Sequence, residues 1–254
     1  MNKVLVLPDI HGRRFWKETC KNIDKYTRVI FLGDYFDPYD FENISISDCI
    51  NNFKEILELK KNNMDKVVLL LGNHDYPYYS ADYYNFSTYH CRHSKMYHNE
   101  ITDLFIKNKE YFKLCHVEGD ILFTHAGIES GWLYDVVGCD ENLDINEICN
   151  VINELQDNIE GQHKLFAITS KRGGWNKYGS CIWTDIHDIM WDIDIDDDKR
   201  KPIHNMKQVF GHTLQAFYDY DNKIVFGKPI EYKNIKMLDT AKSYILNVDT
   251  FNLV

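Results

Sequence analysis

Several polar side chains of metal-binding and acid–base types come directly after short apolar runs of the sequence. They are Asp9, His11, Asp34, Asn73, His74, His125 and His212. Carboxylates and imidazoles together favour first-row transition ions over Ca²⁺ or Mg²⁺ alone. The set is too large for one tetrahedral ion and suits two ions that share a bridging ligand. Two ions roughly 3.5–4 Å apart can clamp the attacking and leaving oxygens of a displacement at phosphorus. The residue types therefore favour metal-dependent chemistry at a phosphate.

The apolar runs that precede these residues predict buried strands, because they are short and rich in β-branched side chains. Strands are expected at 3–7, 28–32, 66–71 and 208–210, and another follows a hairpin turn within 117–123. A 3.6-residue apolar period predicts an amphipathic helix over 45–62, with Ser45 or Ser47 as its cap. Residues 13–26 also fit a helix.

Strands that alternate with helices are typical of βαβ units and a parallel sheet. Ligands of such sheets bind beyond the carboxyl ends of the strands, so the polar clusters at 9–11, 34–37 and 73–75 are expected to converge. In an extended segment, alternation would place Asp9 and His11 on the same side. Gly72 permits a tight exit from its strand at little steric cost.

The rest of the chain is expected to surround this edge of the sheet. Helices are predicted over 102–111 and over most of 128–165, and the tyrosine-rich stretch 76–89 is expected to pack beside the site. The tail predicts an antiparallel sheet with a turn at 221–222, its strands being 218–220, 223–226, 235–239 and 243–248.

Composition excludes some classes of protein. The 254 residues carry a formal charge of −10, which argues against non-specific nucleic-acid binding and thus against a nucleic-acid partner. The seven cysteines are scattered without a CxxC pair, which favours reduced thiols. No apolar stretch is long enough to cross a bilayer, so no membrane partner is expected. We therefore expect a cytoplasmic protein; the oligomeric state stays open.

Five ordered motifs resemble the calcineurin-like metallophosphoesterases. They are Asp9-x-His11, Gly33-Asp34-x-x-Asp37, Gly72-Asn73-His74-Asp75, Thr124-His125-Ala126-Gly127 and Gly211-His212-Thr213. Trp183-Thr184-Asp185 and the Leu214 that follows the last motif are similar to the phosphoprotein-phosphatase branch and its bacterial and phage relatives, which include diadenosine tetraphosphate hydrolases. The resemblance implies an α/β fold in which two central mixed sheets pack as a sandwich flanked by helices. It also implies one domain over 1–254.

The resemblance further implies a role for each matching residue. Asp9 and His11 would hold one divalent ion and Asp34 would bridge two. The second ion would be held by Asn73, His125 and His212. Mn²⁺ is the favoured ion, with Fe, Zn, Co, Ni and Mg as alternatives. A hydroxide between the metals would attack phosphorus directly, His74 would protonate the leaving oxygen, and Asp37 would orient His74.

One departure from the family's pattern concerns the cation that grips phosphate. Pro38 stands where the protein phosphatases carry an arginine, so Arg172, in a glycine-containing loop, is the candidate replacement. The expected substrate is a phosphorylated protein or small molecule, cleaved as a phosphomonoester. Two alternatives stay open: a phosphodiesterase or pyrophosphohydrolase that acts on dinucleoside polyphosphates or cyclic nucleotides, and a non-catalytic scaffold.

Overall fold

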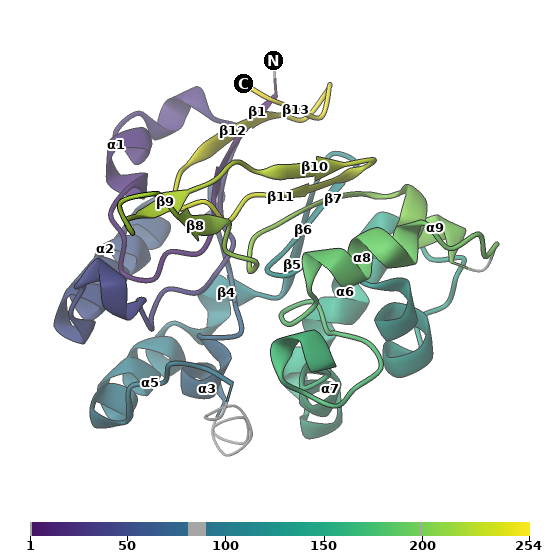
Figure 1. Cartoon of the computed structure of the whole chain (residues 1–254), viewed down its shortest axis with the longest axis horizontal. Coiled ribbons are helices and arrows are strands. Elements are labelled where there is room, and N and C mark those ends of the chain that lie inside the picture. The colour runs from purple at the N-terminus through teal and green to yellow at the C-terminus, as the bar shows by residue number, and fades with distance from the viewer. Residues whose placement is uncertain (1, 81–89, 199) are drawn as a thin grey trace. The chain divides into compact units, whose positions relative to one another are not determined.

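The computed structural model of the chain describes residues 2–80, 90–198 and 200–254 (Figure 1). The chain forms two compact units. Unit 1 comprises Met1–Lys113 together with Ser243–Val254, and unit 2 comprises Leu114–Lys242. Part of the tyrosine-rich stretch, residues 81–89, lies outside the described residues. The expectation of a single domain over 1–254 stays a prediction.

Unit 1 is built on a mixed sheet whose described strands run in the order β13-β12-β1-β2-β3-β4. Their bounds are Lys3–Leu7 (β1), Arg28–Phe31 (β2), Val67–Leu70 (β3), Phe112–Lys113 (β4), Tyr244–Asn247 (β12) and Asn252–Leu253 (β13). The first four strands pair in parallel, and β12 pairs antiparallel with β1. The three strands predicted before residue 72 are therefore confirmed, and their carboxyl ends share one edge.

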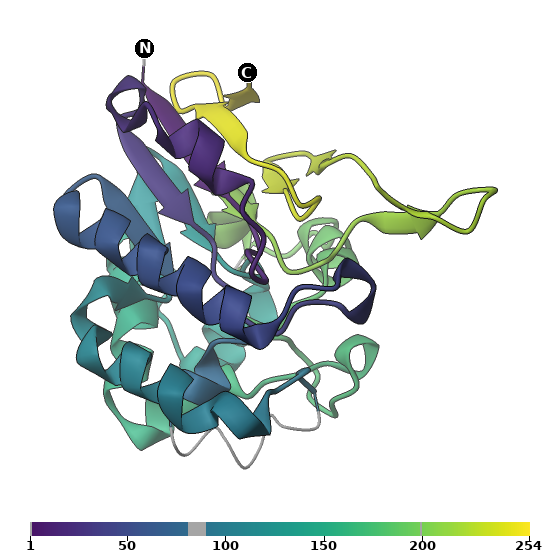
Figure 2. The ribbon, with the colours of Figure 1, turned by 90° about the vertical axis from the view of Figure 1, so that its left-hand side faces the viewer.

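The helices of unit 1 are mostly short, apart from two. The short segments are Trp16–Cys20 (α1), Ile23–Lys25 (η1), Asp40–Glu42 (η2), Tyr76–Tyr79 (α3), Lys95–Tyr97 (η3) and Lys109–Tyr111 (η4). The long helix α2, Ile46–Asn62, confirms the amphipathic prediction (Figure 2). The Ser45 hydroxyl caps it by accepting the Asp48 N–H at 3.1 Å. Helix α5, His98–Lys107, starts four residues before the prediction. The helix predicted over 13–26 is wrong as one element, because the chain there breaks into α1 and η1.

An aromatic cluster joins the helices of unit 1 to its sheet. Phe53 of α2 lies 4.9 Å from Phe105 of α5 and 4.9 Å from Tyr35, measured between ring centroids. Phe105 lies 5.0 Å from Phe112 of β4. Each of these rings is buried. Burial of such large apolar surfaces stabilises the sheet edge after which the polar loops begin.

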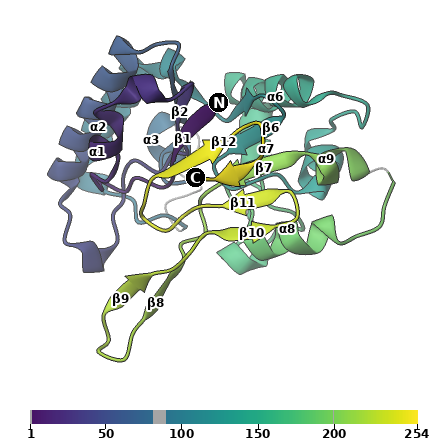
Figure 3. The same ribbon diagram turned by 90° about the horizontal axis from the view of Figure 1, so that it is seen from above.

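Unit 2 contains a second mixed sheet, whose described strands have the order β10-β11-β7-β6-β5. Their bounds are Cys115–Glu118 (β5), Ile121–Thr124 (β6), Lys207–Phe210 (β7), Ile230–Tyr232 (β10) and Ile235–Met237 (β11). The predicted hairpin at 117–123 is confirmed as β5–β6. Strands β8, Ala216–Tyr218, and β9, Ile224–Phe226, form a separate two-stranded hairpin that extends away from β10 and β11 (Figure 3).

The single antiparallel sheet predicted for the tail is wrong. Its strands are distributed over three sheets: β8 and β9 pair with each other, β11 pairs in parallel with β7, and β12 pairs with β1 in unit 1. Strands β10 and β13 were missed. A pattern of short strands separated by turns does not fix which partners the strands take, because antiparallel neighbours and distant strands need the same residue types.

The described helices of unit 2 are Trp132–Val137 (η5), Ile145–Glu154 (α6), Leu155–Asp157 (η6), Ile159–Leu165 (α7), Ser170–Arg172 (η7), Ile186–Ile193 (α8) and Lys201–Asn205 (α9). Four of these helical segments fall within the predicted stretch 128–165, whereas η7, α8 and α9 lie beyond it and were not predicted. Ile186 and Ile189 of α8 pack against Phe210 of β7 and Met237 of β11, which forms a core on this sheet. No described helix of the chain is both long and apolar enough to cross a membrane.

Candidate metal centre and catalytic site

The loops that follow β1 and β2 are joined by backbone hydrogen bonds. The N–H of Ile10 donates to the Gly33 carbonyl at 3.3 Å, and the N–H of His11 donates to the Asp34 carbonyl at 2.6 Å. The N–H of Gly12 continues the ladder to the Tyr35 carbonyl at 3.1 Å. Two loops that the sequence separates by more than twenty residues therefore run side by side beyond the strand ends.

This pairing gathers Asp9, His11 and Asp34 into one buried cluster. Their ligand atoms all lie within 4.8 Å of one another. The Nδ1 atom of His11 lies 2.6 Å from the Phe36 carbonyl, and its Nε2 atom lies 3.5 Å from Asp34 Oδ2. If Nδ1 carries the proton, it donates to that carbonyl and the Nε2 lone pair faces the carboxylate. In metal sites, a hydrogen bond from the ring nitrogen that does not bind the metal orients a histidine ligand in this way.

Burial lowers the pKa of His11 well below its ordinary value, and the charges of His74 and Arg13 lower it further. The imidazole is therefore neutral at physiological pH, which is the form that binds a metal ion. The donor set of this cluster, two carboxylates and one neutral imidazole, fits a first-row divalent ion.

The backbone of these loops departs from the extended conformation that alternation assumed. Asp9 has φ 30°, His11 has φ 43° and Asp34 has φ 53°, all in the left-handed region. Asp37 and His212 share this feature, with φ 58° and 70°. Asp9 and His11 converge because their loop turns, and the strand-like alternation was the wrong reason. Non-glycine residues with positive φ cost energy and gather at functional sites.

The side chain of His74 lies between the cluster of Asp9, His11 and Asp34 and the carboxylate of Asp37. Its Nδ1 atom lies 2.9 Å from Asp37 Oδ2, and its backbone N–H donates to Asp34 Oδ1 at 2.9 Å. Its ring centroid lies 5.2 Å from that of His11. The contact that the sequence suggested between Asp37 and His74 is present, while their catalytic roles stay predictions.

Asp37 is held by more than His74. The Tyr78 hydroxyl donates to Asp37 Oδ1 at 2.7 Å, so both carboxylate oxygens have a partner. Burial raises the pKa of Asp37 to about 7, although the Tyr78 hydrogen bond and the charges of His93 and Arg92 oppose the rise. The carboxylate is thus fixed in one orientation relative to the imidazole.

The loop after β3 approaches the Asp34 loop backbone to backbone. A Cβ atom on Gly33 would lie 2.9 Å from the Gly72 Cα, and one on Gly72 would overlap the Asp34 carboxylate. Both positions therefore require glycine. The side-chain nitrogen of the neighbouring Asn73 donates to Cys91 Sγ at 3.8 Å, and its side-chain oxygen is the potential metal ligand.

The side chain of Asp75 joins the loops after β2 and β3 by hydrogen bonds. Its carboxylate accepts the backbone N–H groups of Asp34 at 2.6 Å, Tyr35 at 2.8 Å and Gly72 at 2.9 Å, and the side chain is fully buried. Asp75 belongs to the Gly72-Asn73-His74-Asp75 motif, but no role for it was predicted from the sequence.

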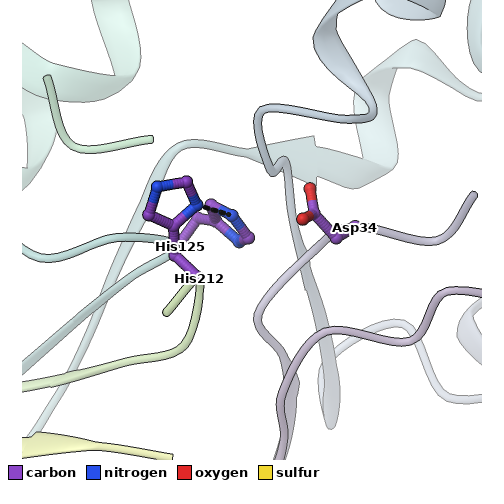
Figure 4. Close-up of side chains that lie close together, drawn as sticks. All are labelled: Asp34, His125 and His212. Carbon is purple, nitrogen blue, oxygen red and sulfur yellow. Dashed lines mark hydrogen bonds between the residues drawn. The ribbon is translucent and has the colours of Figure 1, made fainter. Parts of the chain in front are cut away.

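In unit 2, His125 and His212 face one another. His125 Nε2 lies 3.1 Å from His212 Nδ1, as the dashed line in Figure 4 shows. The Gly211 N–H donates to the His125 carbonyl at 2.8 Å, which fixes the two loops in register. The indole of Trp183 meets the His212 ring edge to face at 5.9 Å. The two imidazoles thus bring two ring nitrogens, which are potential metal ligands, close together.

Arg172, the predicted phosphate contact, lies in unit 2 beside this pair. Its guanidinium forms an ion pair with Asp185 at 3.0 Å and donates to the hydroxyl of Thr213, the residue after His212. Asp185 also caps α8 by accepting the His187 N–H at 2.9 Å. Arg172 is thus anchored rather than solvated, and Asp185 supports it.

The structure adds Asp75, Tyr78 and Arg92 to the neighbourhood of the predicted residues. The Arg92 guanidinium donates to the Asp37 carbonyl through Nε and Nη2, at 3.2 and 2.9 Å. The position of Asp75 directly after His74 was the one available signal. Tyr78 and Arg92 lie in a region without a periodic pattern, so their contacts depend on tertiary structure alone.

Comparison with known proteins agrees with this geometry. A family model described as calcineurin-like phosphoesterase matches residues 2–216. No curated protein compared with the chain matches it. The structure is similar to that of a cold-active protein-tyrosine phosphatase from a psychrophilic Shewanella species, with a TM-score of 0.53 and 17% identity over 98% of this chain and 76% of the other.

A second structure of a cold-active protein tyrosine phosphatase gives a TM-score of 0.53 and 16% identity over 97% of this chain and 74% of the other. At this identity the likeness shows the fold, a mixed α/β arrangement of sheets flanked by helices. The family model spans most of the chain and covers every residue of the five motifs. The chain therefore belongs to the calcineurin-like phosphoesterase family, whose members use divalent metal ions and hydrolyse phosphoester bonds.

Proposed function

We propose that the chain is a metal-dependent phosphatase that hydrolyses phosphomonoesters with His74 as the general acid. The observation that carries the proposal is the position of His74. Its ring is held by Asp37 on one side, its backbone N–H is bonded to Asp34, and Asp34 belongs to the cluster with Asp9 and His11. A proton donor held this close to a potential metal ligand is suited to protonate a leaving oxygen.

The proposed ligand sets follow the order of the family's motifs. Asp9 and His11 would hold one ion, Asp34 would be shared, and Asn73, His125 and His212 would hold the second. When bound, two Mn²⁺ ions would neutralise charge on the phosphoryl oxygens and lower the pKa of a water molecule. The described donor types, carboxylate, imidazole and amide oxygen, suit such ions.

The chain's own residues would supply the remaining steps. Asp37 accepts a hydrogen bond from Nδ1–H of His74, stabilises the imidazolium and thereby leaves its Nε2–H to protonate the leaving oxygen. The Tyr78 hydroxyl fixes the other oxygen of Asp37 and so prevents the carboxylate from rotating. Arg172 is proposed as a phosphate contact from unit 2, because its anchoring by Asp185 and Thr213 places a planar guanidinium beside His212.

The test begins with protein stripped of metal by a chelator and reloaded with Mn²⁺. We expect p-nitrophenyl phosphate to be hydrolysed faster than bis-p-nitrophenyl phosphate and diadenosine tetraphosphate. Preference for either of the latter two would indicate the phosphodiesterase or pyrophosphohydrolase alternative. Inactivity of the metal-loaded protein towards all phosphoesters would contradict the proposal and favour a scaffold.

Metal binding itself gives a readout that is independent of turnover. Titration calorimetry of the stripped protein should give two Mn²⁺ ions per chain. A ligand present at 100 times its Kd stabilises a folded protein by about 2.7 kcal/mol, so Mn²⁺ should also raise the Tm. Asp34→Asn should abolish the rise, and His125→Gln should reduce the stoichiometry to one. Two ions bound to His125→Gln would contradict the proposed ligand set.

A further inference from the structure

Arg92 of unit 1 is joined to the backbone of Asp37 by two hydrogen bonds. Its Nε and Nη2 atoms donate to the Asp37 carbonyl, at 3.2 and 2.9 Å. The side chain of the same Asp37 contacts His74 at 2.9 Å. Arg92 is therefore attached to the residue that orients the proposed general acid, through a different atom of that residue.

A second contact fixes the plane of this guanidinium. Its Cζ atom lies 3.7 Å from the ring centroid of Tyr39, which is a cation–π stack. The Tyr39 ring lies 5.3 Å from the ring of His11, edge to face. Arg92 thus reaches both sides of the site: the His74 side through Asp37, and the His11 side through Tyr39.

The charge of Arg92 is not neutralised by its partners. Across residues 2–80, 90–198 and 200–254, no carboxylate forms an ion pair with it, and its partners are a neutral carbonyl and an aromatic ring. Arg13, the nearby arginine after His11, is by contrast buried and paired with Glu42 at 2.6 Å. Arg172 of unit 2 is paired with Asp185.

An oriented, unneutralised guanidinium is suited to bind a dianion. A guanidinium has five N–H groups in a fixed fork, and the contacts with Asp37 do not use those of Nη1. Arg92 as a residue is exposed, so an incoming ligand can reach it. Holding a planar cation in place before the ligand arrives lowers the entropy cost of binding.

We propose that Arg92 contacts the non-bridging oxygens of the substrate phosphate and thereby favours phosphomonoester dianions over diester monoanions. The proposal rests on the proposed function, because it names the substrate class of the same site. Each additional negative charge on the phosphate strengthens the attraction to the guanidinium.

The test compares Arg92→Gln and Arg92→Lys with wild type, and uses Arg28→Gln as the matched control. Arg28 also donates to a backbone carbonyl, that of Asp65, but lies at the first residue of β2, away from the carboxyl ends of the strands. All proteins are loaded with Mn²⁺. The measurements are KM and kcat for p-nitrophenyl phosphate and bis-p-nitrophenyl phosphate, Ki for inorganic phosphate, and Tm.

We expect Arg92→Gln to raise both the monoester KM and the phosphate Ki by about 10-fold or more, the range of a lost charged hydrogen bond. The diester KM should change by less than threefold, so the ratio of monoester to diester efficiency falls. Arg92→Lys should recover part of the loss, and Arg28→Gln should match wild type.

The proposal is overturned if Arg92→Gln keeps the wild-type phosphate Ki and monoester KM, or if it impairs monoester and diester equally. The second result, with a lowered Tm, would identify Arg92 as a structural tie between its loop and Asp37. Failure of the proposed function has a different signature, since wild type itself would then lack phosphoesterase activity. Calorimetric titration of inorganic phosphate into the Mn²⁺-loaded wild type and Arg92→Gln would still test Arg92 in that case, with unchanged affinity refuting its role.

Discussion

The carboxylate of Asp75 accepts the backbone N–H of Asp34 at 2.6 Å. Through this bond the loop after β3 fixes the conformation of the loop after β2. Asp34 has φ 53°, a conformation that its own side chain disfavours, and Asp75 compensates part of that cost by accepting the N–H groups of Asp34, Tyr35 and Gly72.

Replacement of Asp75 by Asn should therefore destabilise the fold. An amide has one accepting oxygen, so at least one buried N–H loses its partner, at about 1–3 kcal/mol for each such group. Denaturant unfolding should show a loss in this range, and Mn²⁺ affinity should fall because Asp34 is no longer held. The exposed Asp103→Asn is the control, expected within about 0.5 kcal/mol of wild type. Equal stability of the two variants would refute the bracing role.

Gly72→Ala tests the close approach of the two loops. A Cβ at this position would overlap the Asp34 carboxylate, and its distance to the Asp34 nitrogen would be only 2.7 Å. We expect the Asp34 side chain to be displaced and Mn²⁺ binding to weaken by about 10-fold or more, by analogy with loss of the partners that orient metal ligands. Gly227→Ala, where the nearest atoms are 3.5 Å away, should bind Mn²⁺ as wild type does. Calorimetry decides between these outcomes.

Substitution of His74 should have an effect that depends on the leaving group. Removal of a general acid typically costs about 10²–10⁴-fold in rate, and the cost grows as the leaving oxygen becomes more basic. For His74→Asn we expect a larger loss of kcat with an alkyl phosphate than with p-nitrophenyl phosphate, whose phenolate leaves without a proton. His98→Asn, at the start of α5, serves as the histidine control. A loss that is the same for both substrates would remove His74 from the role of acid.

The stability of the protein should depend on pH through Glu129. Burial raises the pKa of this carboxyl from 4.5 to about 7, and the charges of Asp192 and Asp188 add to the rise, although the Gly179 N–H opposes it. Between these two pH values the unfolded chain has released the proton that the folded chain retains. The free energy of unfolding should therefore fall by about 2–3 kcal/mol as pH rises from 4.5 to 7.

Glu129→Gln removes the titrating group, so the difference in stability between wild type and this variant should follow that pH dependence. Denaturant unfolding at half-unit steps of pH measures it. The exposed Glu141→Gln should keep the wild-type profile. A wild-type profile in Glu129→Gln would show that the pH dependence arises elsewhere.

The sequence predicted the elements that local patterns encode. The strands before Asp9, Asp34 and Asn73 are present because short β-branched runs have few alternatives. Helix α2 is present because a 17-residue amphipathic segment begins at a serine cap. Parallel pairing of these strands places the polar residues at one edge, which is why the sequence could predict that Asp9, His11 and Asp34 lie together.

What the sequence could not predict depends on contacts between distant segments. The Asp75 carboxylate accepts hydrogen bonds from the N–H groups of three residues, and no local sequence pattern predicts these contacts. Arg92 and Tyr78 reach Asp37 from more than forty residues away. The left-handed conformations of Asp9 and His11 follow from the ladder between two loops, whereas alternation describes only a regular strand.

The pairing of β12 with β1 has a consequence for the order in which the protein can assemble during translation. Unit 2 is continuous in sequence, whereas unit 1 needs residues 243–254 to place β12 beside β1 and β13 beside β12. All residues of unit 2 are therefore synthesised before β12, so β1 of unit 1 still lacks its partner strand on one side at that stage. Since domains emerge and fold as units during synthesis, the later half of the chain is the first that can be complete.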